Sequence, residues 1–173
     1  NDCITFNQIY TYNKKRKKLN CINSFNTNAS YQNEIVAADK NYVTMHNSDQ
    51  PAEVGWISWN IPYKYSKGKL VAATTSTTTV KSLIANNKKD KYSKYFAKNQ
   101  FVTAKKLTFY NGSKVAYTVP KGKVVTLTKL SLSKDVIYLQ FKYGKKTGWA
   151  HVNGTKYNFS KPWFQGVNAR LAG

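Results

Sequence analysis

Lysine is the residue type through which this chain could do most of its chemistry. The 173 residues include 28 Lys and Arg against 7 Asp and Glu, a formal net charge of +21. Arg16 and Arg170 are the only arginines. Arginine suits two-bond recognition of bases and buried phosphates, whereas lysine acts as a hydrated point charge. A surface of lysines therefore predicts a long, repetitive polyanion as the partner, although such a surface can also be merely solvated.

The basic charge is concentrated after residue 70. Residues 1–70 have nine basic and five acidic side chains, a net charge of +4, and residues 71–173 have nineteen and two, a net charge of +17. We therefore expect the second part to bind the polyanion. The candidate polymer-binding residues are Lys105, Lys106, Tyr110, Lys114, Lys121, Lys123, Lys142, Tyr143, Lys145, Lys146 and Trp163. A candidate second basic cluster consists of Lys88, Lys89 and Lys91.

Catalytic residue patterns are scarce. His46 and His151 are the only histidines, and "HNSDQPAE" brings only His46, Asp49 and Glu53 close together in sequence. These three could bind a cation or act as acid and base, but a polar loop between two strands explains them more simply. The sequence contains no nucleophile-elbow, zinc-protease or phosphate-loop motif. We therefore predict a protein that is not an enzyme and uses no cofactor and no metal.

Cysteine usage and hydropathy bear on the compartment. Cys3 and Cys21 are the only cysteines. They form either a disulfide, which would contribute about 3 kcal/mol by closing a short loop, or two buried thiols, and their spacing matches no metal site. The sequence has no run of 18 apolar residues that would span a membrane. It begins without Met and without a signal peptide, as a processed, secreted chain would.

Short strands are predicted over the first 65 residues. "ITFNQIYTY" and "LNCINSF" are rich in β-branched and aromatic residues and flank the basic "NKKRKK", which predicts a hairpin with a basic tip. Residues 33–38, 41–46 and 54–59 supply three further candidate strands. The Thr-rich stretch Val71–Thr79 is typical of a linker or an exposed strand.

The spacing of apolar residues changes between Thr78 and Lys98. In "VKSLI" the apolar residues stand at positions i, i+3 and i+4, and "YSKYF" repeats the pattern. Thr77 to Thr79 and Asp90 are candidate N-caps. This spacing predicts two short helices, or one kinked helix, between two β regions.

Five strands are predicted after residue 100, in "FVTAKKLTFY", "KVAYTV", "KVVTLTKLSL", "VIYLQFKY" and "KTGWAHV". The connecting stretches "YNGS", "VPKGK" and "YGKK" contain the Asn, Gly and Pro residues that favour tight turns. Many of the lysines are therefore expected on turns.

A Gly-Trp dipeptide ends both β regions, at residues 55–56 and 148–149. "TYN", ending at Asn13, likewise matches "FYN", ending at Asn111, and each precedes a basic turn. The pattern predicts two diverged copies of one β unit, with Trp56 and Trp149 in their cores. The expected divisions are a first repeat at 1–70, a linker with short helices at 71–98 and a strongly basic second repeat at 99–173.

The second copy carries a resemblance to a known family. "KKLTFYNGSKVAYTVPKGKVVTL" and "VIYLQFKYGKKTGWAHV" resemble the repeats that anchor surface-layer proteins of lactobacilli, and the Gly-Trp ending is similar to that of SH3-like GW modules. Most of the resemblance lies in residues 78–165, because the first copy lacks the lysine-glycine turn and most of the lysines. The resemblance implies a mainly β protein of two SH3-like small β-barrel repeats joined by a short helical insert.

The same resemblance implies a secreted protein of the cell surface that is held non-covalently to a Gram-positive cell wall. Its partner would be an anionic secondary polymer such as teichoic or lipoteichoic acid, with other copies in a surface lattice as further partners. Lysines would neutralise the phosphates, and aromatic faces would stack on sugar rings. Two alternatives remain: a barrel that binds single-stranded nucleic acid, which the scarcity of Arg disfavours, and an adhesion module that binds peptidoglycan or protein.

Overall fold

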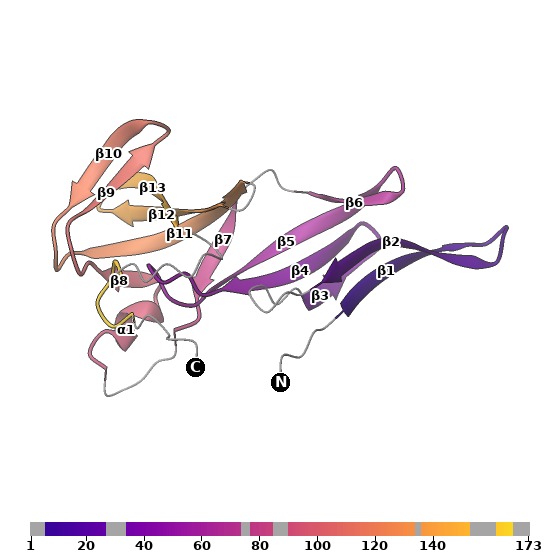
Figure 1. The fold of residues 1–173 in the computed structure, drawn as a ribbon, viewed down its shortest axis with the longest axis horizontal. Helices are drawn as coiled ribbons and strands as arrows, with labels where there is room; N and C mark the ends of the chain where they lie inside the picture. The colour runs from indigo at the N-terminus through magenta and orange to yellow at the C-terminus, as the bar shows by residue number, and fades with distance from the viewer. Residues whose placement is uncertain are drawn as a thin grey trace. The chain divides into compact units, whose positions relative to one another are not determined.

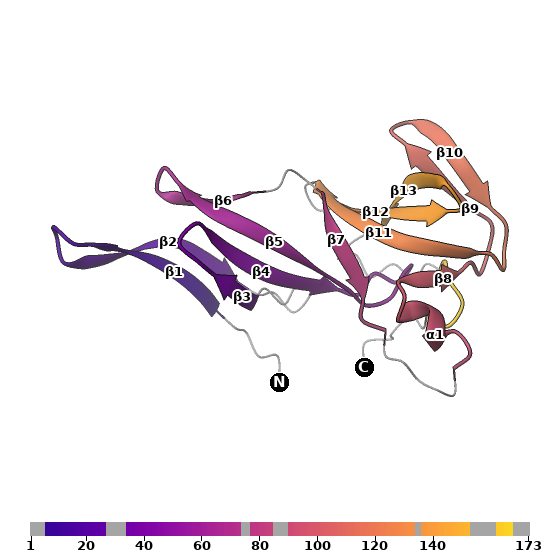
Figure 2. The same cartoon turned by 180° about the vertical axis from the view of Figure 1, so that it is seen from behind.

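A computed structural model describes residues 6–26, 34–73, 77–84, 90–133, 136–152 and 162–167. The chain is mainly β, with antiparallel sheets, as the sequence predicts, but the sheets do not close into a barrel (Figures 1 and 2). It divides into two compact units: unit 1 comprises residues 1–48 and 60–75, and unit 2 comprises residues 49–59 and 76–173. In the part that the structure describes, no helix is long and apolar enough to cross a membrane.

The first predicted hairpin of unit 1 is confirmed. Strands β1 (Phe6–Asn13) and β2 (Lys18–Asn26) pair antiparallel, and the basic residues between them form the turn. The Asn13 side chain accepts a hydrogen bond from the Arg16 backbone N–H at 3.0 Å, which closes the turn. Of the two cysteines, Cys3 lies outside the described residues, and Cys21 is exposed on β2 opposite Tyr10.

The other strands of unit 1 pair in the order β3-β4-β5-β6, and Asp49 of β4 and Ile57–Trp59 of β5 already belong to unit 2. Their bounds are β3 Glu34–Ala38, β4 Tyr42–Asp49, β5 Ile57–Ser66 and β6 Lys69–Ala72. A two-residue turn at Lys67 and Gly68, both with positive φ, joins β5 to β6, although the sequence suggests no hairpin there. The stretch Val71–Thr79, predicted as a linker or an exposed strand, supplies the end of β6.

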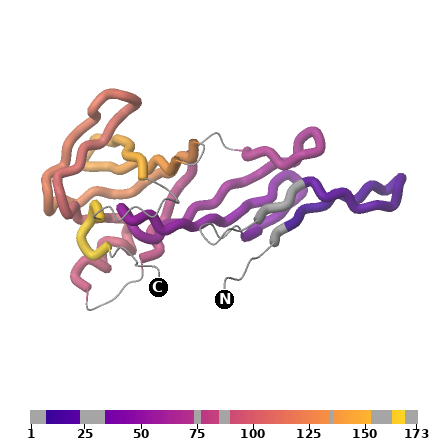
Figure 3. The backbone as a smooth tube through the Cα atoms, in the orientation of Figure 1, coloured from indigo at the N-terminus to yellow at the C-terminus, as the bar shows by residue number. Residues whose placement is uncertain are grey.

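Unit 2 contains the strands β7 to β13. Their bounds are β7 Thr77–Ser82, β8 Gln100–Val102, β9 Leu107–Asn111, β10 Lys114–Val119, β11 Val124–Ser133, β12 Val136–Tyr143 and β13 Lys146–Val152. Within the unit they run in the order β10-β9-β13-β12-β11-β7, with β8 on the first residues of β11. A bridge between Thr103 and Phe164 returns the last described segment to the end of β8. Figure 3 shows the course of this segment in yellow.

The predicted helical insert is wrong in its first half. Thr77–Ser82 is the strand β7, which pairs with β11 on one side and with the first residues of β5 on the other. Its run of Thr and Val residues is β-branched, and such residues are stiff and crowded in a helix but pack well in a sheet. The second predicted helix is confirmed only as a single turn, α1 (Ser93–Phe96), which buries Phe96.

Five phenylalanine rings form the centre of the unit 2 core. Phe101 lies 5.4 Å from Phe96 and 4.9 Å from Phe164 between ring centroids, and Phe141 lies 5.3 Å from both Phe109 and Phe164. All five side chains are fully buried. Aromatic pairs at this spacing add to the stability that area burial alone supplies.

A buried tyrosine extends this core. The Tyr117 hydroxyl donates a 2.7 Å hydrogen bond to the Phe141 carbonyl, which joins β10 to β12 through the interior. Burial raises the pKa of Tyr117 to about 12, so the hydroxyl keeps its proton at any ordinary pH. The hairpin β9–β10 is thereby fixed over the inner face of the sheet.

The two Gly-Trp dipeptides occupy different structural positions. Gly148 lies inside β13, where an added Cβ would stand 2.9 Å from the Phe109 Cβ, so the missing side chain lets β9 approach. Gly55 instead ends a turn before β5 with φ +73°. The prediction that Trp56 and Trp149 belong to the core is wrong: both are half-buried, and Trp59 is the buried tryptophan.

Candidate functional site

The outer face of the unit 2 sheet carries a group of aromatic side chains. Residues alternate between the two faces of a strand, so those that flank buried core residues point outward. Tyr110 on β9 pairs with Trp149 on β13, and Tyr138 on β12 pairs with His151. The Tyr138 and His151 rings are 6.2 Å apart. We call these four residues the outer aromatic face; Tyr110 and Tyr138 are exposed, and Trp149 is half-buried.

A hollow of about 140 Å³ opens beside this face. Strands β9 and β13 pair at one position only, Tyr110 with Trp149, and the hollow lies where they separate. It is lined by Leu107, Thr108, Phe109, Tyr110, Ala150, His151 and Trp163. The liquid volume of one water molecule is about 30 Å³, so the hollow can take a small group or part of a ring.

Backbone hydrogen bonds hold Trp163 at the hollow. Its N–H donates to the Glu53 carbonyl at 2.9 Å, and its carbonyl accepts from the Ala104 N–H at 2.8 Å. The neighbouring Phe164 anchors the segment in the core. Trp163 is half-buried, which fits the prediction of an aromatic side chain available at the surface.

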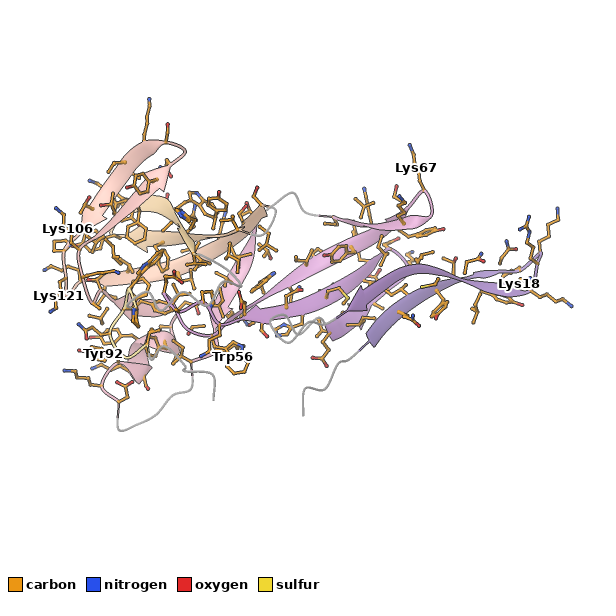
Figure 4. All side chains as sticks on the ribbon, in the orientation of Figure 1. Lys18, Trp56, Lys67, Tyr92, Lys106 and Lys121 are labelled. Carbon is orange, nitrogen blue, oxygen red and sulfur yellow. The ribbon has the colours of Figure 1, made fainter. Side chains whose placement is uncertain are left out.

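Thr103 fastens two lysine-bearing turns to each other. Its hydroxyl donates to the Pro120 carbonyl at 2.7 Å and accepts from the Lys123 N–H at 3.0 Å. The residue is fully buried, so the link is shielded from water. Figure 4 shows Lys106 and Lys121 projecting from the same edge of unit 2. Lysines predicted from separate stretches are thus brought together at this edge: Lys105, Lys106, Lys121 and Lys123.

The other predicted lysines lie at the tips of two hairpins, β9–β10 and β12–β13. The Asn111 amide reaches the Thr147 carbonyl at 3.4 Å, which links the two tips. Lys142 points outward on β12 between Thr126 and Thr147, and the turn that follows is exposed. The lysines of this second group are Lys114, Lys142, Lys145 and Lys146.

Four predicted residues stand apart from the outer aromatic face or cannot be placed. Tyr143 is half-buried against Tyr117, with 6.3 Å between ring centroids, so it belongs to the core side. Lys91 lies with its Nζ 5.0 Å from the Tyr92 ring centroid, in a cation–π contact. Lys88 and Lys89 lie outside the described residues.

Sequence reasoning missed Tyr138, His151 and the exposed Lys129. The signal was present in the alternation of β12, where Tyr138 and Gln140 interrupt Ile137, Leu139 and Phe141. A strand that is apolar on one side and carries an aromatic on the other exposes that aromatic.

The electrostatics of the site are one-sided. Residues 99–133, 136–152 and 162–167 contain nine lysines and neither Asp nor Glu. These lysines produce a positive local field, which falls off over the Debye length, about 8 Å at physiological salt, while the acids Asp49, Glu53 and Asp90 of unit 2 lie outside these ranges. The outer aromatic face is therefore a flat, ring-bearing surface in a positive potential.

The candidate acid-base residues are divided between the two units. His46 belongs to unit 1, where its Nδ1 is 2.8 Å from the Asn60 side-chain oxygen. Asp49 and Glu53 lie in unit 2; burial raises the pKa of Asp49 to about 6, the Gln50 N–H lowers it, and the Glu53 carboxylate raises it further. Across the described residues there is no group of three or more His, Cys, Asp or Glu that could hold a metal ion.

Comparison of the chain with protein-family models, with curated proteins and with solved structures gave no match. The function must therefore be argued from the site itself. Its residues 99–133, 136–152 and 162–167 combine exposed aromatic rings with lysines and contain no Asp or Glu.

Proposed function

We propose that unit 2 holds the protein non-covalently to the wall of a Gram-positive cell by binding an anionic secondary polymer, teichoic or lipoteichoic acid. The observation that carries the proposal is that the outer aromatic face belongs to residues 99–133, 136–152 and 162–167, which contain nine lysines and neither Asp nor Glu. A polyol phosphate chain offers closely spaced charges and apolar carbons or sugar rings between them. Lysines would pair with the phosphates of the polymer, and Tyr110 and Trp149 would pack against its sugar rings.

Counterion release would supply much of the affinity. Each neutralised phosphate frees a condensed cation, so binding weakens steeply with salt, by analogy with nucleic acids. The register pairs Thr126, near the start of β11, with Lys142, near the end of β12, so the turn with Lys121 and Lys123 and the turn with Lys145 lie at the same end of these strands. A polymer chain held by these lysines could extend along the strands to the aromatic rings. Binding would depend on the polymer's charge density more than on a particular sequence of units.

We further propose that residues 99–167 form one SH3-like module, as the family resemblance implies. The pairing of β8 with β11 and the bridge from Thr103 to Phe164 support this, because they bring the start and the end of the segment together. In this proposal the protein is a secreted, surface-layer type protein. Unit 1 is not assigned to a second module of the same kind, since the two Gly-Trp dipeptides differ in position.

A second candidate function is the binding of single-stranded nucleic acid. The observation that favours it is the same outer aromatic face: flat rings on a sheet, bordered by lysines, can stack bases in a sequence-tolerant way. The two functions differ in the part of the ligand that would contact the aromatic side chains. Bases stack on Tyr138 and Trp149 through a π face, whereas a wall polymer presents sugar or polyol carbons.

The test is binding of the intact protein to purified Gram-positive walls, before and after chemical removal of teichoic acid, over a range of salt. We expect binding to disappear with the polymer and its salt dependence to fall when Lys142, Lys145 and Lys146 are replaced by Ser. The matched control carries Lys14→Ser, Lys15→Ser and Lys17→Ser in unit 1 and should bind as before.

Single-stranded DNA serves as competitor in the same assay. Displacement from walls only at high DNA excess supports the wall polymer. Undiminished binding to extracted walls would exclude teichoic acid and indicate peptidoglycan or protein. Absent wall binding together with tight DNA binding would replace the proposal by its second candidate.

A further inference from the structure

The turn between β1 and β2 concentrates positive charge. Lys14, Lys15, Arg16, Lys17 and Lys18 are consecutive and all exposed. The hairpin that carries them pairs without a break from Asn13–Lys18 back to Tyr10–Cys21. Its tip is therefore a compact group of five cations at the end of a two-stranded arm.

One face of the same arm is apolar and open to solvent. Tyr12 pairs with Leu19 and Tyr10 pairs with Cys21, so these four residues point to one side. Leu19 is 67% exposed, Tyr12 58% and Tyr10 47%. The Tyr10 hydroxyl donates to the Gln8 side chain at 2.7 Å, which holds its ring along the strand. An aliphatic and two aromatic side chains thus stand in solvent directly beside the five cations.

A second hairpin of unit 1 also places exposed basic residues beside an exposed aromatic side chain, with fewer residues of each kind. The turn of β5–β6 carries exposed Lys64, Lys67 and Lys69, and Tyr65 beside them is 53% exposed. Both tips point toward the same end of unit 1 in Figures 1 and 2, and Figure 4 labels Lys18 and Lys67 there. Eight of the nine basic residues of residues 1–48 and 60–75 lie on these two hairpins. We call this surface the basic end of unit 1.

Unit 1 as a whole leaves apolar side chains uncovered. Thirteen large hydrophobic residues are exposed among the described residues, and eight of them belong to unit 1. These eight are Tyr10, Tyr12, Leu19, Ile35, Val36, Tyr42, Tyr65 and Val71. Exposed apolar groups clustered beside charge mark an interaction surface rather than ordinary solvent-facing positions.

We propose that the basic end of unit 1 docks onto the surface of an anionic lipid bilayer. Its charge matches the lipid phosphates, and its tyrosines and Leu19 match the boundary between headgroups and acyl chains, where amphipathic aromatic rings prefer to lie. A soluble polyanion would satisfy the lysines but would leave Leu19 in water. A second copy of the chain would place two clusters of like charge against each other. The bilayer satisfies both the charge and the apolar groups.

This docking is independent of the function proposed for unit 2. It uses other residues on another unit, and its ligand is a lipid bilayer instead of a wall polymer. It also involves no spanning segment, since only side chains at the hairpin tips enter the interface. Binding should require anionic lipid and should weaken with salt, because each basic residue near the surface contributes about a fivefold change in affinity.

The experiment is co-sedimentation of the intact protein with vesicles of phosphatidylcholine that contain either one third phosphatidylglycerol or none. We expect binding to the anionic vesicles alone. Replacing Lys14, Lys15, Arg16 and Lys17 by Ser should weaken it at least about a hundredfold. The matched control replaces four lysines of unit 2, Lys121, Lys142, Lys145 and Lys146, and should change vesicle binding by less than about threefold.

A second variant tests the apolar part without changing charge. Tyr12→Ser with Leu19→Ser should weaken vesicle binding about tenfold or more and leave binding to a soluble polyanion, heparin, unchanged. In a third variant, Tyr12→Trp, indole fluorescence should shift to shorter wavelength on anionic vesicles. All sites are exposed, and circular dichroism verifies that the variants fold.

Three results would overturn the proposal. Equal losses from the unit 1 and unit 2 charge variants would indicate attraction by net charge alone. An unchanged affinity of the Tyr12→Ser, Leu19→Ser variant would show that nothing apolar enters the bilayer, leaving a polyanion or an acidic protein as the partner. No binding to anionic vesicles at low salt would exclude the lipid surface directly.

Discussion

Units 1 and 2 both present lysines on hairpin turns, but they support them differently. Of the twenty buried hydrophobic residues that the structure describes, Met45 alone belongs to unit 1. The lysines of unit 2 stand on strands and turns whose sheet is backed by a phenylalanine core, so the backbone that carries them is well supported. Those of unit 1 stand on arms with open apolar faces. In the functions proposed above, unit 2 would therefore present a rigid face to its polymer, and unit 1 would adapt to a lipid surface.

Amide hydrogen exchange should show the largest difference between the two units. Exchange from the centre of β12, at Leu139, requires opening of the buried core, whereas a two-stranded arm is only marginally stable. We expect the amides of β12 to exchange at least about a thousandfold more slowly than those of β1 and β2. Mass spectrometry of peptic fragments measures both at once. Equal protection would mean that unit 1 has a stabilising core of its own, and that its lysines are supported as firmly as those of unit 2.

Phe141→Ala should cause the largest loss of stability of any single substitution proposed for unit 2. The ring contacts Phe101, Phe109 and Phe164, so truncation leaves a cavity among them. Comparable substitutions lower the free energy of unfolding by about 3–5 kcal/mol. Urea unfolding followed by tryptophan fluorescence measures the loss. The control is Lys142→Ala, which points outward on the same strand and should change stability by less than about 0.5 kcal/mol.

The strands of unit 2 could be predicted from the sequence because their patterns are local. The ranges expected for β12 and β13 are confirmed, and "YNGS" does form a hairpin turn, with the positive φ at Gly112. The division of "FVTAKKLTFY" into β8 and β9 could not be seen, since Thr103 ends β8 through hydrogen bonds to Pro120 and Lys123. Those partners are about twenty residues away in sequence.

Long-range packing also explains why the predicted first helix and the predicted equivalence of the two Gly-Trp dipeptides are wrong. The helical spacing of Val80, Leu83 and Ile84 is real, but β7 is held as a strand by neighbours on both sides, β5 and β11. The repeated Gly-Trp suggested equivalent positions, yet Gly148 is required by the approach of Phe109 and Gly55 by its own backbone turn. The Gly-Trp dipeptide therefore occurs twice for two different structural reasons, and only the contacts in the folded chain distinguish them. The lysines of the site could be listed from sequence, but not the outer aromatic face that lies among them.

Gly148→Ala tests whether the packing of the β9–β10 hairpin requires the absence of a side chain at this position. The added methyl would lie 2.9 Å from the Phe109 Cβ and 3.0 Å from the Tyr117 Cε1, so the β9–β10 hairpin must shift. Overpacking of this kind costs about 1–3 kcal/mol. Because Tyr110 lies on the shifted hairpin, wall binding should weaken as well. Thr147→Ala, exposed on the same strand, serves as control in both unfolding and binding. A fully stable Gly148→Ala protein would show that the hairpin is not packed as described.

Asp49 should give the smallest effect, a dependence of unit 2 stability on pH. Burial raises the pKa of Asp49 from 3.8 in the unfolded chain to about 6 in the folded one, so the folded state binds the proton more tightly. The contribution of Asp49 to stability is therefore greatest below pH 3.8 and is lost as the pH rises through 6. Asp49 is only half-buried, and screening by solvent reduces the expected change to about 1–2 kcal/mol.

Asp49→Asn isolates this contribution from that of every other acid. The amide cannot ionise, and its shape lets it retain the hydrogen bond from the Gln50 N–H. The difference in unfolding free energy between the variant and the native protein should therefore grow in the variant's favour between pH 4 and pH 7. A constant difference would mean that the Asp49 carboxylate is solvated or compensated.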